Sequence, residues 1–273
     1  MKIRFLIPFF FIAFGLILVS CKSSSSRIPK NDKQAFDSYW RQDKSEVSVY
    51  AFDQLLDTSH YKGQITFIFE LENFSKKRGF KLDEPKKHPG DAVEVMQCNQ
   101  VRQWNTVTGQ SNMMTSVFTA LDYKEHPHSI KWESGYQDWS GQTFLQANYK
   151  GFRYETRYYS SFANEGDVET KLVNTFLEDE IWNKIRVSPD ELPVGNFRMV
   201  PAAFYIHSSH TALKEYDASA TITEVQDHYQ YSVTYPDLNR KVIIHFEKEM
   251  PHKILGWTEM KDDKEIFSAT LLL

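Results

Sequence analysis

The sequence predicts a mainly β protein, a curved antiparallel sheet or half-open barrel with a minor α component and one substantial helix at about 168–186. Three observations lead to this prediction. Aromatic residues make up 15% of the chain, and aromatic side chains suit the half-buried surface of a sheet. Many segments alternate apolar and polar residues with a period of two, which is typical of strands. Short turn-forming stretches separate these segments, which implies antiparallel neighbours.

The alternating segments give the expected order of strands. A long apolar row runs through Ile65, Phe67, Phe69 and Leu71. Two segments on either side of Lys150-Gly151 predict a hairpin, which we place at 143–149 and 152–158. The C-terminal third predicts a meander with strands at Arg198–His207, Tyr216–Glu224, Tyr229–Tyr235, Arg240–Glu247 and Lys253–Glu259.

The expected helix rests on an apolar row that recurs every four residues. Val173, Leu177, Ile181 and Ile185 form this row, and Asp167 is a suitable N-cap. We expect the helix to cover one face or end of the curved sheet.

The N-terminus has the anatomy of a lipoprotein signal peptide over residues 1–20. Basic residues are followed by an apolar run that is shorter than the roughly 18 residues needed to span a bilayer. The run ends in Leu18-Val19-Ser20-Cys21, which resembles the bacterial lipobox, in which the cysteine carries the lipid. We therefore expect a lipid on Cys21, a flexible tether over 21–35 and a single β-rich domain over 36–273.

A signal peptide and a lipid on Cys21 imply a compartment and a membrane partner. Acyl chains on Cys21 would hold the protein on the inner or outer membrane of a Gram-negative cell envelope, and the sequence leaves both membranes open. Loss of Lys2 and Arg4 with the signal peptide changes the net charge from -4 to -6. Such an acidic balance argues against a nucleic-acid partner. Cys98, the second of two cysteines, is expected to be a buried, inert thiol.

No motif identifies an enzyme, a cofactor or a metal site. The histidines at positions 126, 128, 207 and 210 are candidate metal ligands, but nothing in the sequence brings them together. Glu165, Asp167 and Glu169 are interpreted as charges at the start of the helix. Most of Glu178-Asp179-Glu180 is expected to face solvent. Glu180 could be partly buried, and a buried acid paired with Arg186 or Arg198 would be structural.

The best candidate for a ligand site is the segment from Trp132 to Gly141. Trp132, Tyr136 and Trp139 could line the mouth of a cavity for a lipid or a sugar, because large aromatic side chains stand there beside glycines and polar groups. The alternative is that Trp132 and Tyr136 pack in the core and that the glycines mark bulges or turns.

Residues 39–260 resemble a family of Bacteroidetes lipoproteins without an established activity, often labelled "septum formation inhibitor Maf". The resemblance is carried by Met113–Thr119, Trp139-Ser140-Gly141, Glu165-Gly166-Asp167, Leu177–Arg186, Tyr235–Leu238 and Gly256–Glu259. It implies a further strand beyond the C-terminal leucines, which leaves the pairing of the last strand open. Genuine Maf proteins are nucleotide pyrophosphatases with a phosphate loop after a strand. The only similar string, Ser23–Arg27, lies in the tether, so we expect no such activity.

Two functions from different classes follow. The first is a non-catalytic envelope lipoprotein that binds a lipid, a glycan or a protein. The second is an envelope hydrolase whose acidic and histidine residues come together only in the fold. A continuous apolar cavity or concave face would favour the first, whereas a fully packed interior would count against ligand binding and leave a protein-interaction role. Convergence of the acidic and histidine residues in a cleft would favour the second.

Overall fold

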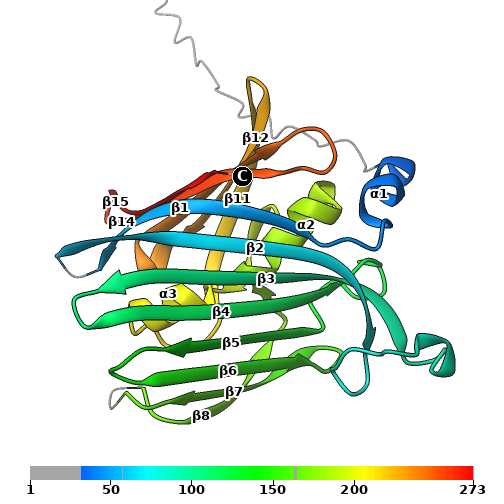
Figure 1. Ribbon diagram of the computed structural model, residues 1–273, viewed down its shortest axis with the longest axis horizontal. Helices are drawn as coiled ribbons and strands as arrows, with labels where there is room; N and C mark the ends of the chain where they lie inside the picture. The colour runs from blue at the N-terminus through cyan, green and yellow to red at the C-terminus, as the bar shows by residue number, and fades with distance from the viewer. Residues whose placement is uncertain (1–31, 57, 163–164, 273) are drawn as a thin grey trace, which may run out of the picture.

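A computed structural model describes residues 32–272 except 57, 163 and 164. The predicted signal peptide and the predicted lipid site, Cys21, lie outside the described residues. One sheet of fifteen strands dominates the fold, in the order β8-β7-β6-β5-β4-β3-β2-β1-β15-β14-β13-β12-β11-β10-β9. All neighbouring strands are antiparallel except β9 and β10, which are parallel. The mainly β class is therefore confirmed, and the sheet curves strongly (Figure 1).

The strands have the following bounds: β1 Glu46–Leu56, β2 Ser59–Ser75, β3 Ala92–Thr106, β4 Gly109–Ala120, β5 Lys131–Gln137, β6 Gln142–Tyr149, β7 Arg153–Ser160, β8 Val168–Val173, β9 Phe176–Leu177, β10 Gly195–Val200, β11 Tyr216–Val225, β12 His228–Tyr235, β13 Arg240–Glu247, β14 Ile254–Lys261 and β15 Lys264–Leu271. The helices are α1 Lys33–Trp40, α2 Ile181–Val187 and α3 Ala203–Ser208, with 3₁₀ turns η1 Pro85–Lys87, η2 Glu178–Glu180, η3 Pro189–Glu191 and η4 Pro236–Leu238. Helix α1 begins inside the stretch predicted as tether.

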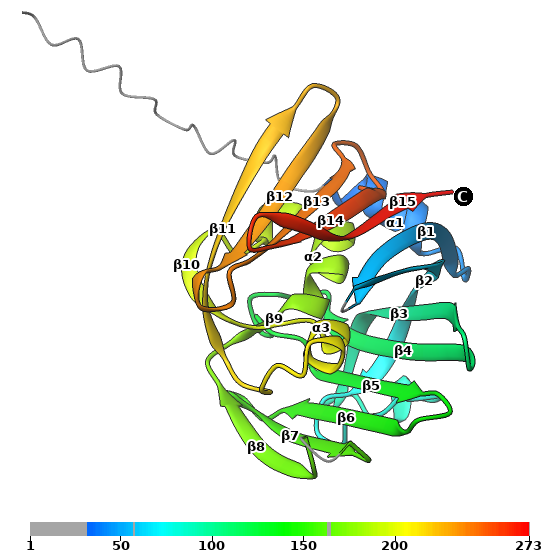
Figure 2. The same ribbon diagram turned by 90° about the vertical axis from the view of Figure 1, so that its left-hand side faces the viewer.

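The sheet has two arms, which we call the first arm (β1–β8) and the second arm (β10–β15). They join where β1 pairs with β15, so the last strand lies between β14 and β1. The predicted hairpin is β6–β7, and the predicted C-terminal meander is present as consecutive antiparallel strands of the second arm. Figure 2 shows α2 and α3 in the space between the two arms.

Aromatic side chains fill much of this space. The rings of Phe67 and Trp182 lie 5.2 Å apart, and those of Trp182 and Trp257 lie 5.0 Å apart. Tyr50 packs edge-on against Trp257 at 5.2 Å. Since these residues come from β1, β2, α2 and β14, the cluster joins both arms through α2.

The predicted helix over 168–186 is mostly wrong. Residues 168–173 form the edge strand β8, paired with β7, and the helix is limited to Ile181–Val187. In β8, Leu172 is buried whereas Val173 is 49% exposed, which is the alternation of a strand. The four-residue apolar row is real, but β-branched residues at 168, 170 and 173 suit a strand once β7 offers backbone partners. Asp167 therefore caps no helix.

A second correction concerns the predicted strand Arg198–His207. Strand β10 ends at Val200, and after Pro201 the chain forms the short helix α3. Ala202, the residue before this helix, provides no side-chain cap. The cap comes from a distant carboxylate, Asp179, which accepts the backbone N–H of Ala203 at 2.8 Å.

Candidate functional site

Three consecutive acids of η2 lie at the centre of the molecule. Glu178, Asp179 and Glu180 are only 4%, 3% and 0% exposed. The expectation that most of this triplet faces solvent is therefore wrong. Each carboxylate points to a different part of the fold, and each finds its own partners there.

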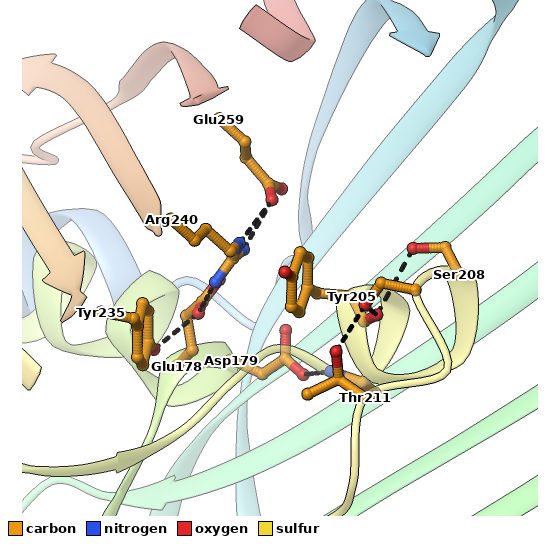
Figure 3. Close-up of polar contacts among 10 residues, drawn as sticks. Glu178, Asp179, Tyr205, Ser208, Thr211, Tyr235, Arg240 and Glu259 are labelled. Carbon is orange, nitrogen blue, oxygen red and sulfur yellow. Dashed lines mark hydrogen bonds and ion pairs between the residues drawn. The ribbon is translucent and has the colours of Figure 1, made fainter. Parts of the chain in front are cut away.

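Glu178 forms a closed ion-pair network with the second arm (Figure 3). The guanidinium of Arg240 donates to both oxygens of Glu178, at 2.5 and 2.7 Å, and to Glu259 at 2.6 and 3.0 Å. Tyr235 donates its hydroxyl to Glu178 at 2.6 Å, and the Tyr205 ring lies 4.0 Å from the guanidinium carbon. Burial opposes the charge on Arg240, but the two carboxylates raise its pKa. The network ties η2 to β12, β13 and β14.

Asp179 points in another direction, toward the first arm and α3. It accepts the indole N–H of Trp132 at 3.0 Å and the backbone N–H of Ala203 at 2.8 Å. Burial raises the pKa of Asp179 to about 6. The carboxylate thus joins β5 to the start of α3.

Glu180 and the first turns of α2 bind the first arm. Glu180 accepts the backbone N–H of Ser129 at 2.9 Å. The side-chain amide of Asn183 donates to the carbonyl oxygens of Met96 at 3.0 Å and Val117 at 3.1 Å. Together with the contacts of Glu178, these bonds make η2 and α2 a cross-brace between the two arms.

Helix α3 closes over a buried guanidinium. The ring of Phe204 lies 3.6 Å from the guanidinium carbon of Arg102, and Phe267 lies 4.9 Å from it. Arg102 is 3% exposed, and its Nε and Nη1 have no hydrogen-bond partner among the described residues. Burial lowers the pKa of Arg102 to about 10. Contact with aromatic faces partly compensates the lost hydration of the cation.

The structure does not bring the three predicted ligand-lining residues to one cavity. Trp132 is fully buried, and its indole binds Asp179. Tyr136 is 7% exposed, donates its hydroxyl to Asp138 and stacks with its ring 3.8 Å from that of His207. Trp139 is 72% exposed in the turn between β5 and β6.

The candidate histidines separate into two places. His126 and His128 lie in the connection between β4 and β5, whereas His207 and His210 lie at the end of α3. Within the described part of the chain, no group of three or more His, Cys, Asp and Glu residues is arranged to hold a metal ion.

One acid and one histidine do converge. His210 Nδ1 lies 2.6 Å from the carboxylate of Glu165, which also accepts the hydroxyls of Tyr158 at 2.7 Å and Ser160 at 2.6 Å. Glu165 therefore lies in the connection between β7 and β8 rather than at a helix start. The imidazole is 60% exposed at its side chain. Such a pair could orient a general base.

Two serine hydroxyls at the end of α3 are turned away from this pair. Ser208 and Ser209 both donate to the carbonyl oxygen of Tyr205. Neither is bonded to His210, and Ser160 gives its hydroxyl proton to Glu165, so no serine of the described residues is bonded to the imidazole that would activate it. A cavity of about 330 Å³ adjoins it, and its wall includes Leu55, Leu56, Phe204, Tyr205, His210 and Glu259.

A larger cavity, of about 720 Å³, lies along β10. We call it the β10 edge cavity. Its lining includes Asn174, Phe176, Asn196, Phe197, Arg198 and Asp217, together with His128. No feature of the sequence indicated this cavity, because its residues come from five separate segments of the chain.

Comparison with known proteins gives one structural similarity. No protein-family model matches the chain, and no curated protein matches it. The chain is similar to a beta-barrel-like protein of the domain of unknown function DUF1849 from Brucella abortus. The TM-score is 0.48 at 11% sequence identity, over 83% of this chain and 95% of the other. Across the described residues, no helix has the length and apolarity required to span a bilayer.

Proposed function

We propose that this protein is a non-catalytic binding scaffold of the cell envelope, held on a membrane by a lipid on Cys21. The anchoring part of the proposal is supported by the hydrophobic leader and the lipobox-like Leu18–Cys21. The acidic balance of the chain disfavours nucleic acid as a partner.

The observation that carries the scaffold role is the cross-brace between the arms. Aromatic rings and the Arg240 ion-pair network occupy the interior, so a lipid carried inside the sheet would have to displace them. Of the two cavities described above, the larger is the β10 edge cavity, which lies toward the β9 end of the sheet. Recognition of a glycan or a protein at this end of the sheet fits the geometry better than transport of a lipid through the interior.

A hydrolase is the second candidate, because Glu165 and His210 converge beside a cavity. The scaffold is better supported, since Ser208 and Ser209 give their hydroxyl protons to a backbone carbonyl. Without an activated nucleophile, the pair is better explained as a contact between the β7–β8 connection and the end of α3.

The anchoring is tested with the full-length chain in a Gram-negative host that is fed radiolabelled palmitate. Wild-type protein should incorporate label and sediment with membranes after a carbonate wash. Cys21→Ser should lose both properties, because no thiol remains at the lipobox to be acylated. Cys98→Ala is the matched control, since Cys98 is a buried free thiol. Membrane retention of Cys21→Ser would refute the proposal.

A further inference from the structure

The β10 edge cavity lies beside unpaired backbone. Strand β9 pairs with β10 only at Met199 and Val200, whereas β11 pairs with β10 from Gly195 to Met199. Residues 195–198 therefore have no strand on their second side within the described sheet. At such an edge, alternate N–H and C=O groups are free to bind a ligand.

Two aromatic rings form the apolar part of the cavity. Phe176 and Phe197 are both half-buried, and their rings meet edge-to-face at 5.5 Å and 79°. The perpendicular arrangement presents two differently oriented faces. The C–H-rich face of a pyranose ring packs well on such surfaces, as apolar groups generally do on aromatic rings.

Planar polar groups supply the rest of the lining. Asn174 and Asn196 are exposed amides, each with two donors and an acceptor. Asn174 has a φ of +47°, a left-handed conformation that asparagine tolerates and that fixes its direction from the backbone. Arg198 lies 3.4 Å from Asp217 and donates to the carbonyl oxygen of Glu215 at 2.9 Å. The planar amide and guanidinium groups each present several hydrogen-bonding atoms side by side, which suits hydrogen bonds to neighbouring hydroxyl groups of a sugar.

A buried histidine completes the lining. His128 is 8% exposed and belongs to the cavity lining, and its ring lies 4.9 Å from that of Phe176. Burial lowers the pKa of His128, which favours the neutral imidazole. The histidine therefore supports the Phe176 ring and adds no positive charge to the lining.

The net charge of the cavity lining and the length of the free β10 edge distinguish between ligand classes. Arg198 and Asp217 neutralise each other, so the lining offers no net charge to a phosphate or another anion. The free edge covers residues 195–198, about 13 Å at 3.3 Å per residue. That is shorter than the usual strand of five or six residues, which disfavours an added peptide strand.

We propose that the β10 edge cavity binds a short neutral saccharide, such as a mono- or disaccharide, with Phe176 and Phe197 as stacking surfaces and Asn196 and Arg198 as hydroxyl-binding groups. This inference rests on the proposed scaffold function and names the ligand class of that site.

The test uses full-length protein in detergent with three probes: maltose, cellobiose and N,N′-diacetylchitobiose. Saturation-transfer NMR and calorimetry should detect binding of at least one probe. Phe197→Ala should weaken that binding about tenfold or more, through loss of a stacking face. Asn196→Ala, at an exposed position that does not threaten folding, should weaken it several-fold. Phe152→Ala removes a 61% exposed ring on the β6–β7 turn and should leave binding unchanged.

Absence of binding for all three sugars at about 10 mM, a concentration above the dissociation constant of a specific site, would overturn the saccharide assignment. Equal binding by wild type, Phe197→Ala and Asn196→Ala would overturn the location. The palmitate and fractionation result for Cys21→Ser is independent of both outcomes, so failure of the ligand class and failure of the anchored scaffold remain distinguishable.

Discussion

Replacement of Arg240 by methionine tests whether the interior network is desolvated and closed. The guanidinium is fully buried, and its two carboxylate partners, Glu178 and Glu259, are 4% and 7% exposed. Arg240→Met keeps an unbranched side chain of similar reach but removes the charge. Two buried carboxylates would then face each other without a counter-ion at hydrogen-bonding distance.

The expected loss is large on the scale of domain stability. Breaking a buried ion pair by removal of one partner costs about 3–5 kcal/mol, because the remaining charge is left uncompensated. The free energy of unfolding of an ordinary domain is about 5–15 kcal/mol.

Urea unfolding at pH 7, followed by near-UV circular dichroism, measures this loss. The triple variant with Glu178→Gln, Arg240→Met and Glu259→Gln removes all three charges and should recover much of the stability. Arg157→Met is the surface control, since Arg157 and its partner Glu169 are 61% and 68% exposed, and should cost less than about 1 kcal/mol. A loss below about 1 kcal/mol for Arg240→Met at pH 7 would refute the closed network.

Three further predictions concern single side chains around α3. His207 has a pKa lowered by burial to about 4, so the unfolded chain takes up the proton first as pH falls. Its contribution to the free energy of unfolding should drop by about 3 kcal/mol between pH 6.5 and pH 4, and a wild-type stability curve no steeper than that of His207→Gln would contradict this. Trp132→Phe removes the indole donor of Asp179 and should cost about 1.5–3 kcal/mol in urea unfolding; Trp139→Phe, at an exposed position, is its control. His210→Gln should leave p-nitrophenyl acetate hydrolysis at the wild-type background rate, and a clear decrease would revive the hydrolase.

The sheet was predictable from sequence because its signal is local. Alternating rows such as Ile65, Phe67 and Phe69 are fully buried in β2 as expected, and the hairpin and meander follow from turns between adjacent strands. The same local reasoning failed over 168–173, because a four-residue apolar row fits a helix and a strand equally well until the partner strand is known.

The candidate sites depend on residues far apart in the chain. Glu178 and Arg240 are 62 positions apart, so the sequence around either residue does not indicate that the two form an ion pair. Helix α3 was missed for a similar reason, since its cap is Asp179 rather than a neighbouring residue. The β10 edge cavity combines the β4–β5 connection with β9, β10 and β11, and no spacing rule links these segments.

The pairing of β15 with β1 has a consequence for how the chain folds. These strands join the two arms, yet about 200 residues of chain separate them. Contacts of such long sequence separation form late, because the loop must close before the contact can stabilise it. As the chain is synthesised, β1 can pair with β2 early but lacks its second neighbour, β15, until that strand has been made. Folding should therefore be slow and cooperative over both arms, and a chain that lacks β15 should remain open at the middle of its sheet.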